Sequence, residues 1–131
     1  MKQPRRTILL IDDEPHFGRL LKMNIETMTP YACMVTSNGL EGVKAVQQHR
    51  PDLVLLDMMM PGISGLETLK RIKAAAPEVP VAMLTAVSRE DESAQCFAAG
   101  AFDYLAKPVD FGYLKAHVFA KLFGAADPPR T

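Results

Sequence analysis

The chain has 131 residues, of which 48% are apolar and 23% are charged, and its fifteen Lys and Arg residues balance fifteen Asp and Glu residues. This size and composition indicate one globular domain, and the zero net charge argues against direct nucleic acid binding by phosphate neutralisation. Because the sequence has no apolar stretch near ~18 residues and no charged leader before an apolar segment, we expect no membrane span and a cytoplasmic location.

Five short apolar runs are predicted to be strands, and each is followed by a helical pattern. The strands cover residues 7–11, 31–36, 53–56, 79–84 and 102–105. The helices open at Pro15, at Asn38 with Glu41, at Ser64 with Glu67, at Ser88 with Asp91 and at Asp110. Proline suits the first turn of a helix, and a polar residue followed three positions later by an acid is typical of a capping box.

The two ends of the chain lie outside this pattern. Lys2, Arg5 and Arg6 precede the first strand, and we expect them to form a solvated tail. Residues 124–131 are expected to be a tail or the start of a linker, since they include two consecutive prolines. The predicted domain therefore covers residues 1–123.

Strict alternation of strands and helices predicts an α/β fold with a single doubly wound (βα)5 domain. Parallel neighbours need crossover connections, so the five strands should form a parallel sheet with helices on both faces. The apolar runs do not alternate with polar residues, as expected for strands that are covered on both faces. The common order is the flavodoxin-like 2-1-3-4-5, which places the ends of the first and third strands side by side and predicts a site there.

Polar residues follow four of the five predicted strands at their carboxyl ends. These residues are Asp12 and Asp13 after the first strand, Asp57 after the third, Thr85 after the fourth and Lys107 after the fifth. Each one alone has an ordinary structural explanation. Asp12 or Asp13 could cap a helix, and Asp57 could form a turn. Thr85 could be a strand-end hydroxyl, and Lys107 a solvated amine. Their coincidence at one edge of the sheet is what indicates a functional site.

The charges of these residues indicate what the site binds. Three carboxylates and one ammonium sum to −2, which is unfavourable at close quarters unless a cation joins them, and carboxylate oxygens suit Mg²⁺. Asp57 is then a plausible nucleophile, because a carboxylate can attack phosphorus to give an aspartyl phosphate. Lys107 would neutralise charge on the phosphoryl oxygens, and Thr85 would donate a hydrogen bond to one of them.

This set of residues resembles the receiver domain of two-component response regulators over about residues 7–123. The resemblance rests on Asp12-Asp13, Asp57, Thr85, Tyr104 and Lys107-Pro108. It implies that Asp57 is the phosphoacceptor and that Lys107 pairs first with the acceptor and later with the phosphoryl group. It also implies a cis bond before Pro108. The implied Mg²⁺ ligands are Asp12, Asp13, Asp57 and the backbone carbonyl of Met59.

The resemblance also implies partners and a switch. The phosphoryl group would come from a sensor histidine kinase or a phosphotransfer protein, and the domain would catalyse its own phosphotransfer and dephosphorylation without being an enzyme in the usual sense. Thr85 would move toward the phosphoryl group and Tyr104 would turn into the vacated space. This change would alter the surface formed by the fourth helix, the fifth strand and the fifth helix, as a shift between two populations.

Two positions depart from the family members that hydrolyse their phosphoryl group quickly. Met59 and Val87 lie two residues after Asp57 and Thr85, and both are apolar where polar side chains could orient a water molecule. We therefore expect comparatively slow loss of the phosphoryl group.

Three alternative functions fit these residues less well. A flavin carrier needs anion-binding donors after the first strand, where this chain has acids. An aspartate-based phosphatase of the haloacid dehalogenase type needs a second Asp two residues after the nucleophile, where this chain has Met59. A receiver-like interaction module that acts without phosphorylation remains the main alternative.

The output of the domain stays open at this point. Either the domain docks a partner protein directly, or residues 124–131 begin a linker to an output domain, and we favour the linker. The last helix carries Phe111, Tyr113, Phe119 and Phe123, more aromatic surface than one core-facing stripe is expected to use. This pattern suggests a surface for a partner or a homodimer.

Overall fold

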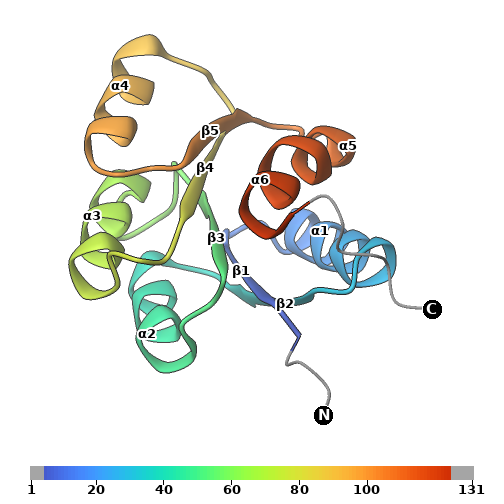
Figure 1. Ribbon diagram of the computed structural model, residues 1–131. Helices are drawn as coiled ribbons and strands as arrows, with labels where there is room; N and C mark the ends of the chain where they lie inside the picture. The colour runs from blue at the N-terminus through green and yellow to red at the C-terminus, as the bar shows by residue number, and fades with distance from the viewer. Residues whose placement is uncertain (1–4, 125–131) are drawn as a thin grey trace.

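The computed structural model describes residues 5–124, and it shows five parallel strands in one sheet with helices on both faces (Figure 1). The strands are β1 Thr7–Ile11, β2 Ala32–Thr36, β3 Leu53–Asp57, β4 Val81–Thr85 and β5 Asp103–Ala106. The helices are α1 Pro15–Met28, α2 Gly39–His49, α3 Gly65–Ala75, α4 Glu90–Ala98, and a last continuous helix made of α5 Phe111–Tyr113, η1 Leu114–Phe119 and α6 Ala120–Phe123.

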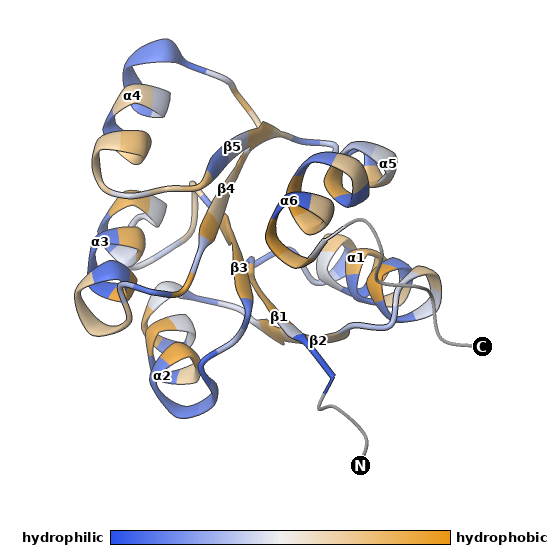
Figure 2. Ribbon diagram, viewed as in Figure 1, coloured by the Kyte–Doolittle hydropathy of each residue, from blue (hydrophilic) through white to orange (hydrophobic). Residues whose placement is uncertain are grey.

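The strand order is β2-β1-β3-β4-β5, which confirms the predicted α/β fold and its doubly wound order. α1 and the last helix pack on one face of the sheet, while α2, α3 and α4 pack on the other. β3 and β4 are buried along their whole length, which explains their uninterrupted apolar sequences. Figure 2 shows the apolar residues concentrated on these central strands and on the helix surfaces that face them.

Three of the predicted helix starts have the expected caps. The side chains of Asn38, Ser64 and Asp110 each accept a hydrogen bond from a backbone N–H three residues later. The predicted start at Ser88 with Asp91 is wrong, because α4 begins one residue later with Arg89 as its N-cap and no side-chain cap bond. The hydroxyl of Tyr104 on β5 accepts a hydrogen bond from the Arg89 N–H at this helix start.

The last helix also differs from the prediction. Its middle part, Leu114–Phe119, is a π-helix. Phe119 and Phe123 are buried and pack edge-on against Tyr31, with ring centroids 5.4 and 5.0 Å away. The aromatic residues of this helix therefore serve mainly the core, and Tyr113 alone among the four is exposed. The expectation of a surplus aromatic surface was wrong.

The side chains of Arg5 and Arg6, directly before β1, contact other parts of the fold. The Arg5 guanidinium donates hydrogen bonds to the carbonyls of Pro30 and Tyr31, and the Arg6 guanidinium lies 4.9 Å from the centre of the Phe123 ring. Arg5 and Arg6 are exposed, as the expectation of a solvated segment implies, but their side-chain contacts show that they are not part of a free tail. Lys2 lies outside the described residues. The predicted tail of residues 124–131 also lies outside them, except for Gly124.

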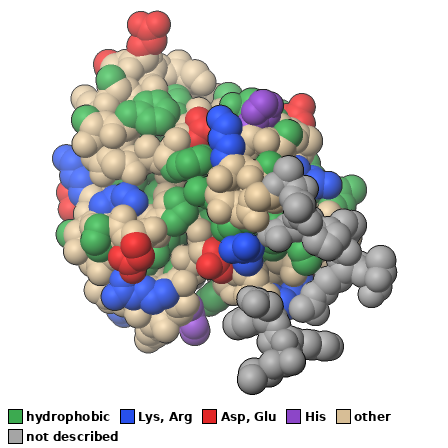
Figure 3. Space-filling view, in the orientation of Figure 1, with side chains coloured by type: hydrophobic (Ala, Val, Ile, Leu, Met, Phe, Trp, Pro, Cys, Tyr) green, Lys and Arg blue, Asp and Glu red, His purple; other side chains and the backbone are tan. Residues whose placement is uncertain are grey.

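Acidic and basic side chains are interspersed on the face that Figure 3 shows, and hydrophobic side chains lie among them. This mixed pattern agrees with the zero net charge of the sequence. Within residues 5–124, no helix is both long enough and apolar enough to cross a membrane.

Candidate functional site

The carboxyl ends of the four strands β1, β3, β4 and β5 lie next to one another at one edge of the sheet. β3 pairs with β4 so that Asp57 is in register with Leu84, directly before Thr85. β4 pairs with β5 so that Thr85 is in register with Ala106, directly before Lys107. Parallel pairing therefore brings together the polar residues that the sequence scatters over about a hundred positions.

Three carboxyl groups form the centre of this site. One oxygen from each of Asp12, Asp13 and Asp57 lies within 4.8 Å of the others, and both Asp12 and Asp57 are buried while Asp13 is exposed. Burial raises the pKa of the Asp57 carboxyl, and the nearby Asp12 charge raises it further. This cluster is what the strand ends predicted, and its hard oxygen donors fit a divalent cation such as Mg²⁺.

The amino group of Lys107 lies among these acids. Its Nζ donates a hydrogen bond to Asp12 Oδ2 at 2.7 Å and lies 3.6 Å from Asp57 Oδ2 and 3.4 Å from Glu14 Oε1. Burial alone would lower the pKa of this ammonium, but the hydrogen bond and charge of Asp12, with the charge of Asp57, raise it above its usual value. The Lys107–Pro108 bond is cis, as the resemblance implied.

The contact of Lys107 with Glu14 was not predicted. Glu14 follows the acidic pair Asp12-Asp13 and is the N-cap residue of α1. Its place in the sequence therefore indicates a role in the helix start and not a contact with Lys107. The aromatic ring of Phe17 also lies below the amine, with its centre 4.4 Å from Nζ. Both residues come from the first turns after β1, so the β1–α1 segment supplies most of the surroundings of the amine.

Gly65 is a second residue of the site that the sequence reasoning missed. A Cβ atom at this position would lie 2.5 Å from the carbonyl oxygen of Asp57 and 2.6 Å from the Cα of Met58. The Gly65 N–H donates to the Met58 carbonyl at 3.0 Å. Glycine therefore lets the start of α3 approach the end of β3, which fixes the backbone that carries Asp57.

The hydroxyl groups of Thr85 and Tyr104 lie on the α4 side of the site. Thr85 Oγ1 donates to the Val87 carbonyl at 2.9 Å and accepts from the Val87 N–H at 3.2 Å. Tyr104 Oη donates to Glu92 Oε1 at 2.6 Å and accepts from the Arg89 N–H at 3.3 Å. Burial raises the pKa of the Tyr104 phenol, and the bond to Glu92 raises it further.

Two apolar side chains stand at the rim of the site. Met59 is 72% exposed and Val87 is 55% exposed, so both are open to the solvent from which a water molecule would attack. A cavity of about 570 Å³ lies beside the acids and is lined in part by Asp12, Asp13 and Thr36.

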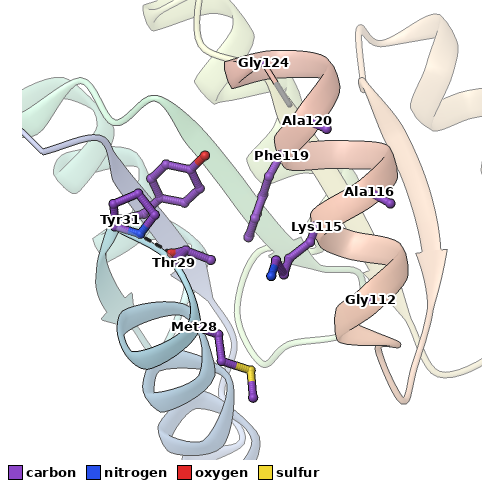
Figure 4. A pocket seen from close by; sticks show the side chains of 10 residues that line it. Met28, Thr29, Tyr31, Gly112, Lys115, Ala116, Phe119, Ala120 and Gly124 are labelled. Carbon is purple, nitrogen blue, oxygen red and sulfur yellow. Dashed lines mark hydrogen bonds between the residues drawn. The ribbon is translucent and has the colours of Figure 1, made fainter. Parts of the chain in front are cut away.

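A separate cavity of about 420 Å³ lies away from these residues, between the end of α1 and the last helix (Figure 4). Its lining includes Tyr31, Lys115 and Phe119 and none of the residues that the sequence predicted for the site. The chemistry of the carboxyl edge, not the presence of a cavity, therefore identifies the candidate functional site.

The fold and this acidic edge define a phosphoacceptor signalling domain of the receiver class. Residues 8–119 match the response regulator receiver domain family, and the chain belongs to that family. It is similar to the phosphate regulon transcriptional regulatory protein PhoB of Pseudomonas aeruginosa, with 36% identity over 89% of this chain and 52% of that protein. It is also similar to the DNA-binding dual master transcriptional regulator RpaA of Synechocystis, with 37% identity over 88% of this chain and 48% of that protein.

Among solved structures, a CheY-like response regulator receiver domain protein from Methanospirillum hungatei is similar to this chain, with a TM-score of 0.85 and 25% identity. The similarity covers 91% of this chain and 94% of that one. The chain spans about half the length of the curated relatives that it matches. Response regulators of this family belong to two-component systems, which are signal transduction systems.

Proposed function

We propose that Asp57 accepts a phosphoryl group from a partner sensor histidine kinase or phosphotransfer protein. A carboxylate oxygen of Asp57 attacks phosphorus, the bond from phosphorus to the donor's leaving group breaks, and an aspartyl phosphate forms. The observation that carries this proposal is the meeting of Asp12, Asp13 and Asp57 oxygens within 4.8 Å, with the amine of Lys107 beside them.

The proposed ligands of Mg²⁺ are Asp12, Asp13, Asp57 and the backbone carbonyl of Met59. When bound, Mg²⁺ would neutralise negative charge on the phosphoryl oxygens. Lys107 supplies the remaining positive charge, since its ammonium already lies 3.6 Å from Asp57 Oδ2. Thr85 supplies a hydroxyl donor to a phosphoryl oxygen once it leaves Val87. With these groups the domain catalyses both its own phosphorylation from small donors and its own dephosphorylation.

The output follows from Thr85 and Tyr104. When the Thr85 hydroxyl turns to the phosphoryl group, the Tyr104 ring changes position, and the surface formed by α4, β5 and the last helix changes with it. That surface docks an output domain, a partner protein or a second copy of the chain. The phosphoryl group drives this change only by the difference in its interaction with the two conformers.

The similar proteins support a transcriptional output. They are named as transcriptional regulators, and this chain spans about half their length. We propose that residues 1–123 form the receiver domain, that residues 124–131 begin a linker to an output domain, and that the protein acts in the cytoplasm. The receiver domain itself has zero net charge and is not proposed to bind nucleic acid.

Incubation with acetyl phosphate, with and without Mg²⁺, tests the proposal. We expect one acid-stable, base-labile phosphoryl group per chain by intact mass spectrometry, and only with Mg²⁺. Asp57→Asn should abolish the modification because the nucleophilic oxygen is lost. Asp91→Asn is the matched control, since Asp91 is an exposed acid on α4, and it should be modified like the unaltered chain.

Two results would overturn the proposal. Modification that persists in Asp57→Asn would move the acceptor to another residue. Absence of modification both with acetyl phosphate and with a phosphorylated histidine phosphotransfer domain would favour the alternative, a receiver-like module that acts without phosphorylation. Nothing in residues 5–124 favours that alternative at present.

A further inference from the structure

Helix α4 starts in a way that differs from the other two helices on the same face of the sheet. The helices α2 and α3 begin at polar residues whose side chains accept a backbone hydrogen bond, whereas Arg89 at the start of α4 makes no side-chain cap bond. In a capping box, the acid three residues after the N-cap returns to the N–H of the N-cap residue. In α4 that acid is Glu92, and the N–H is that of Arg89.

The hydroxyl of Tyr104 occupies the gap between these two groups. Its oxygen accepts from the Arg89 N–H at 3.3 Å, and its proton is donated to Glu92 Oε1 at 2.6 Å. A phenol has one proton to donate and lone pairs to accept with, so it satisfies both groups at once. The hydroxyl of Tyr104 on β5 therefore links the two groups that would bond to each other directly in a capping box.

The same loop is held at its other end by the switch threonine. Residues 86–89 connect β4 to α4. Thr85 Oγ1 donates to the carbonyl of Val87 and accepts from its N–H, and the Tyr104 hydroxyl also lies within hydrogen-bonding reach of the Thr85 side chain. Two hydroxyl groups, one from Thr85 and one from Tyr104, thus hold this short loop from both sides. If either hydroxyl changes its hydrogen bonds, the loop backbone can move, and the backbone groups available to the other hydroxyl change.

We propose that Glu92 is a positioning residue that holds the Tyr104 ring against the start of α4, so that the orientation of Tyr104 and the folding of the first turn of α4 form one equilibrium. When the Tyr104 ring turns away, Arg89 loses its acceptor and Glu92 loses its donor together. The first turn of α4 then opens, and this opening is the change that a docking partner detects. The regulatory part of this inference rests on the proposed function.

Glu92 favours the unphosphorylated conformer. In that conformer the Thr85 proton is donated to the Val87 carbonyl, so it is not available to a phosphoryl oxygen. Phosphorylation must break this bond, and the loop that Glu92 and Tyr104 hold resists the movement. Loss of Glu92 should therefore raise the rate of phosphorylation, because it weakens the conformer in which Thr85 is engaged.

The acids beside Glu92 offer matched controls. Glu90 and Asp91 lie in the same first turn, carry the same charge, face solvent, and have the same favourable position near the amino end of the helix. A role of Glu92 through charge alone would be shared by these two residues. A role through the Tyr104 hydroxyl belongs to Glu92 alone.

The test measures the unphosphorylated protein first, by NMR amide exchange and by tyrosine ring chemical shifts. We expect Glu92→Ala to speed exchange at the Arg89 amide about fivefold, which corresponds to about 1 kcal/mol, and to move the ring signals of Tyr104. Tyr104→Phe should speed exchange equally, and the double variant should show no further increase. Glu92→Gln keeps an acceptor oxygen and should restore most of the protection.

The outcomes separate this inference from the proposed function. Equal effects of Glu90→Ala and Glu92→Ala, or additive effects of Glu92→Ala and Tyr104→Phe, would overturn the positioning role even if Asp57 is phosphorylated. A positioning role seen in the unphosphorylated protein would stand even if Asp57 accepts no phosphoryl group. If Asp57 is phosphorylated, a rate with acetyl phosphate that Glu92→Ala leaves unchanged or lowers would overturn the regulatory part.

Discussion

The two edge strands of the sheet are attached to their neighbouring helices in different ways. At one edge, helix α1 holds the backbone of β2, because Glu26 accepts from the Cys33 N–H at 3.0 Å and Lys22 donates to the Cys33 carbonyl. At the other edge, helix α4 holds a side chain of β5, because Glu92 accepts from the Tyr104 hydroxyl. A backbone group cannot turn away from its partner without moving the strand, whereas a side chain can rotate.

The residues that lead into these two strands differ in the same sense. Tyr31 precedes β2, is 5% exposed, and packs against Phe119 and Phe123. Phe102 precedes β5 and is 36% exposed. Helix α4 buries Cys96 alone, while α1 and α3 each bury several residues. The β2 edge is therefore packed firmly against the rest of the fold. The β5 edge makes fewer buried contacts, so a conformational change there breaks fewer of them.

The largest predicted effect compares two phenylalanines at these edges. Phe119→Ala should lower the free energy of unfolding by about 3–5 kcal/mol, because it empties the aromatic cluster that anchors the start of β2. Phe102→Ala removes the same atoms from a partly exposed position and should lower it by about 1 kcal/mol or less. Urea denaturation measures both values. Equal losses would contradict the view that the β5 edge is the less tightly built one.

Magnesium offers a second comparison, between the centre of the sheet and its β5 edge. A ligand that binds only the folded chain stabilises it by about 2.7 kcal/mol at a hundred times its Kd. We expect Mg²⁺ to slow amide exchange in β1 and β3 to the extent that this stabilisation predicts. Asp13→Asn should reduce this slowing. Exchange in α4 should change little, because its opening leaves Asp12 and Asp57 in place. Equal protection of α4 would show that the edge opens only with the whole fold.

The next prediction concerns the rim between the centre and the β5 edge. Met59→Asn together with Val87→Glu should speed loss of the phosphoryl group about tenfold, which corresponds to about 1.4 kcal/mol in the barrier, because polar groups can then orient a water molecule. Decay of the labelled protein after removal of the donor measures this rate. Met23→Asn and Leu20→Glu make similar changes at exposed positions on α1 and serve as controls. An unchanged or slower decay would refute the role given to the two apolar residues.

The sequence predicted those parts of the site that depend on strand ends. Asp12, Asp57 and Lys107 each follow an apolar run, and the rules for parallel sheets bring such ends to one edge without further information. The caps at Asn38 and Ser64 were predicted for a similar reason, since donor and acceptor lie within three residues of each other.

Features that depend on distant residues were not predictable in this way. The Arg89 N–H at the start of α4 donates to the Tyr104 hydroxyl, and the need for glycine at position 65 depends on the backbone of Asp57 and Met58. Arg5 looked like part of a tail because its acceptors, the carbonyls of Pro30 and Tyr31, lie far along the chain. In each case the partner is brought close by the fold, and no spacing in the sequence records it.

The smallest predicted effect is at the β2 edge and depends on pH. The hydrogen bond from the Cys33 N–H lowers the pKa of the Glu26 carboxyl below its usual value of 4.5, and Lys22 lowers it further. Because the folded pKa is the lower one, the charged carboxylate stabilises the fold above the unfolded value, and this contribution is lost as the pH falls through the folded pKa.

Glu26→Gln should therefore lower the free energy of unfolding by about 1 kcal/mol or less at pH 7, since the pair is partly exposed and the amide oxygen can still accept a weaker bond. The difference from the unaltered chain should shrink steadily as the pH is lowered below about 4.5. Urea denaturation across this range measures it, with Glu78→Gln, which alters an exposed ion pair with Arg50, as the control. A difference that stayed constant down to the lowest pH would mean that the charge of Glu26 does not hold β2.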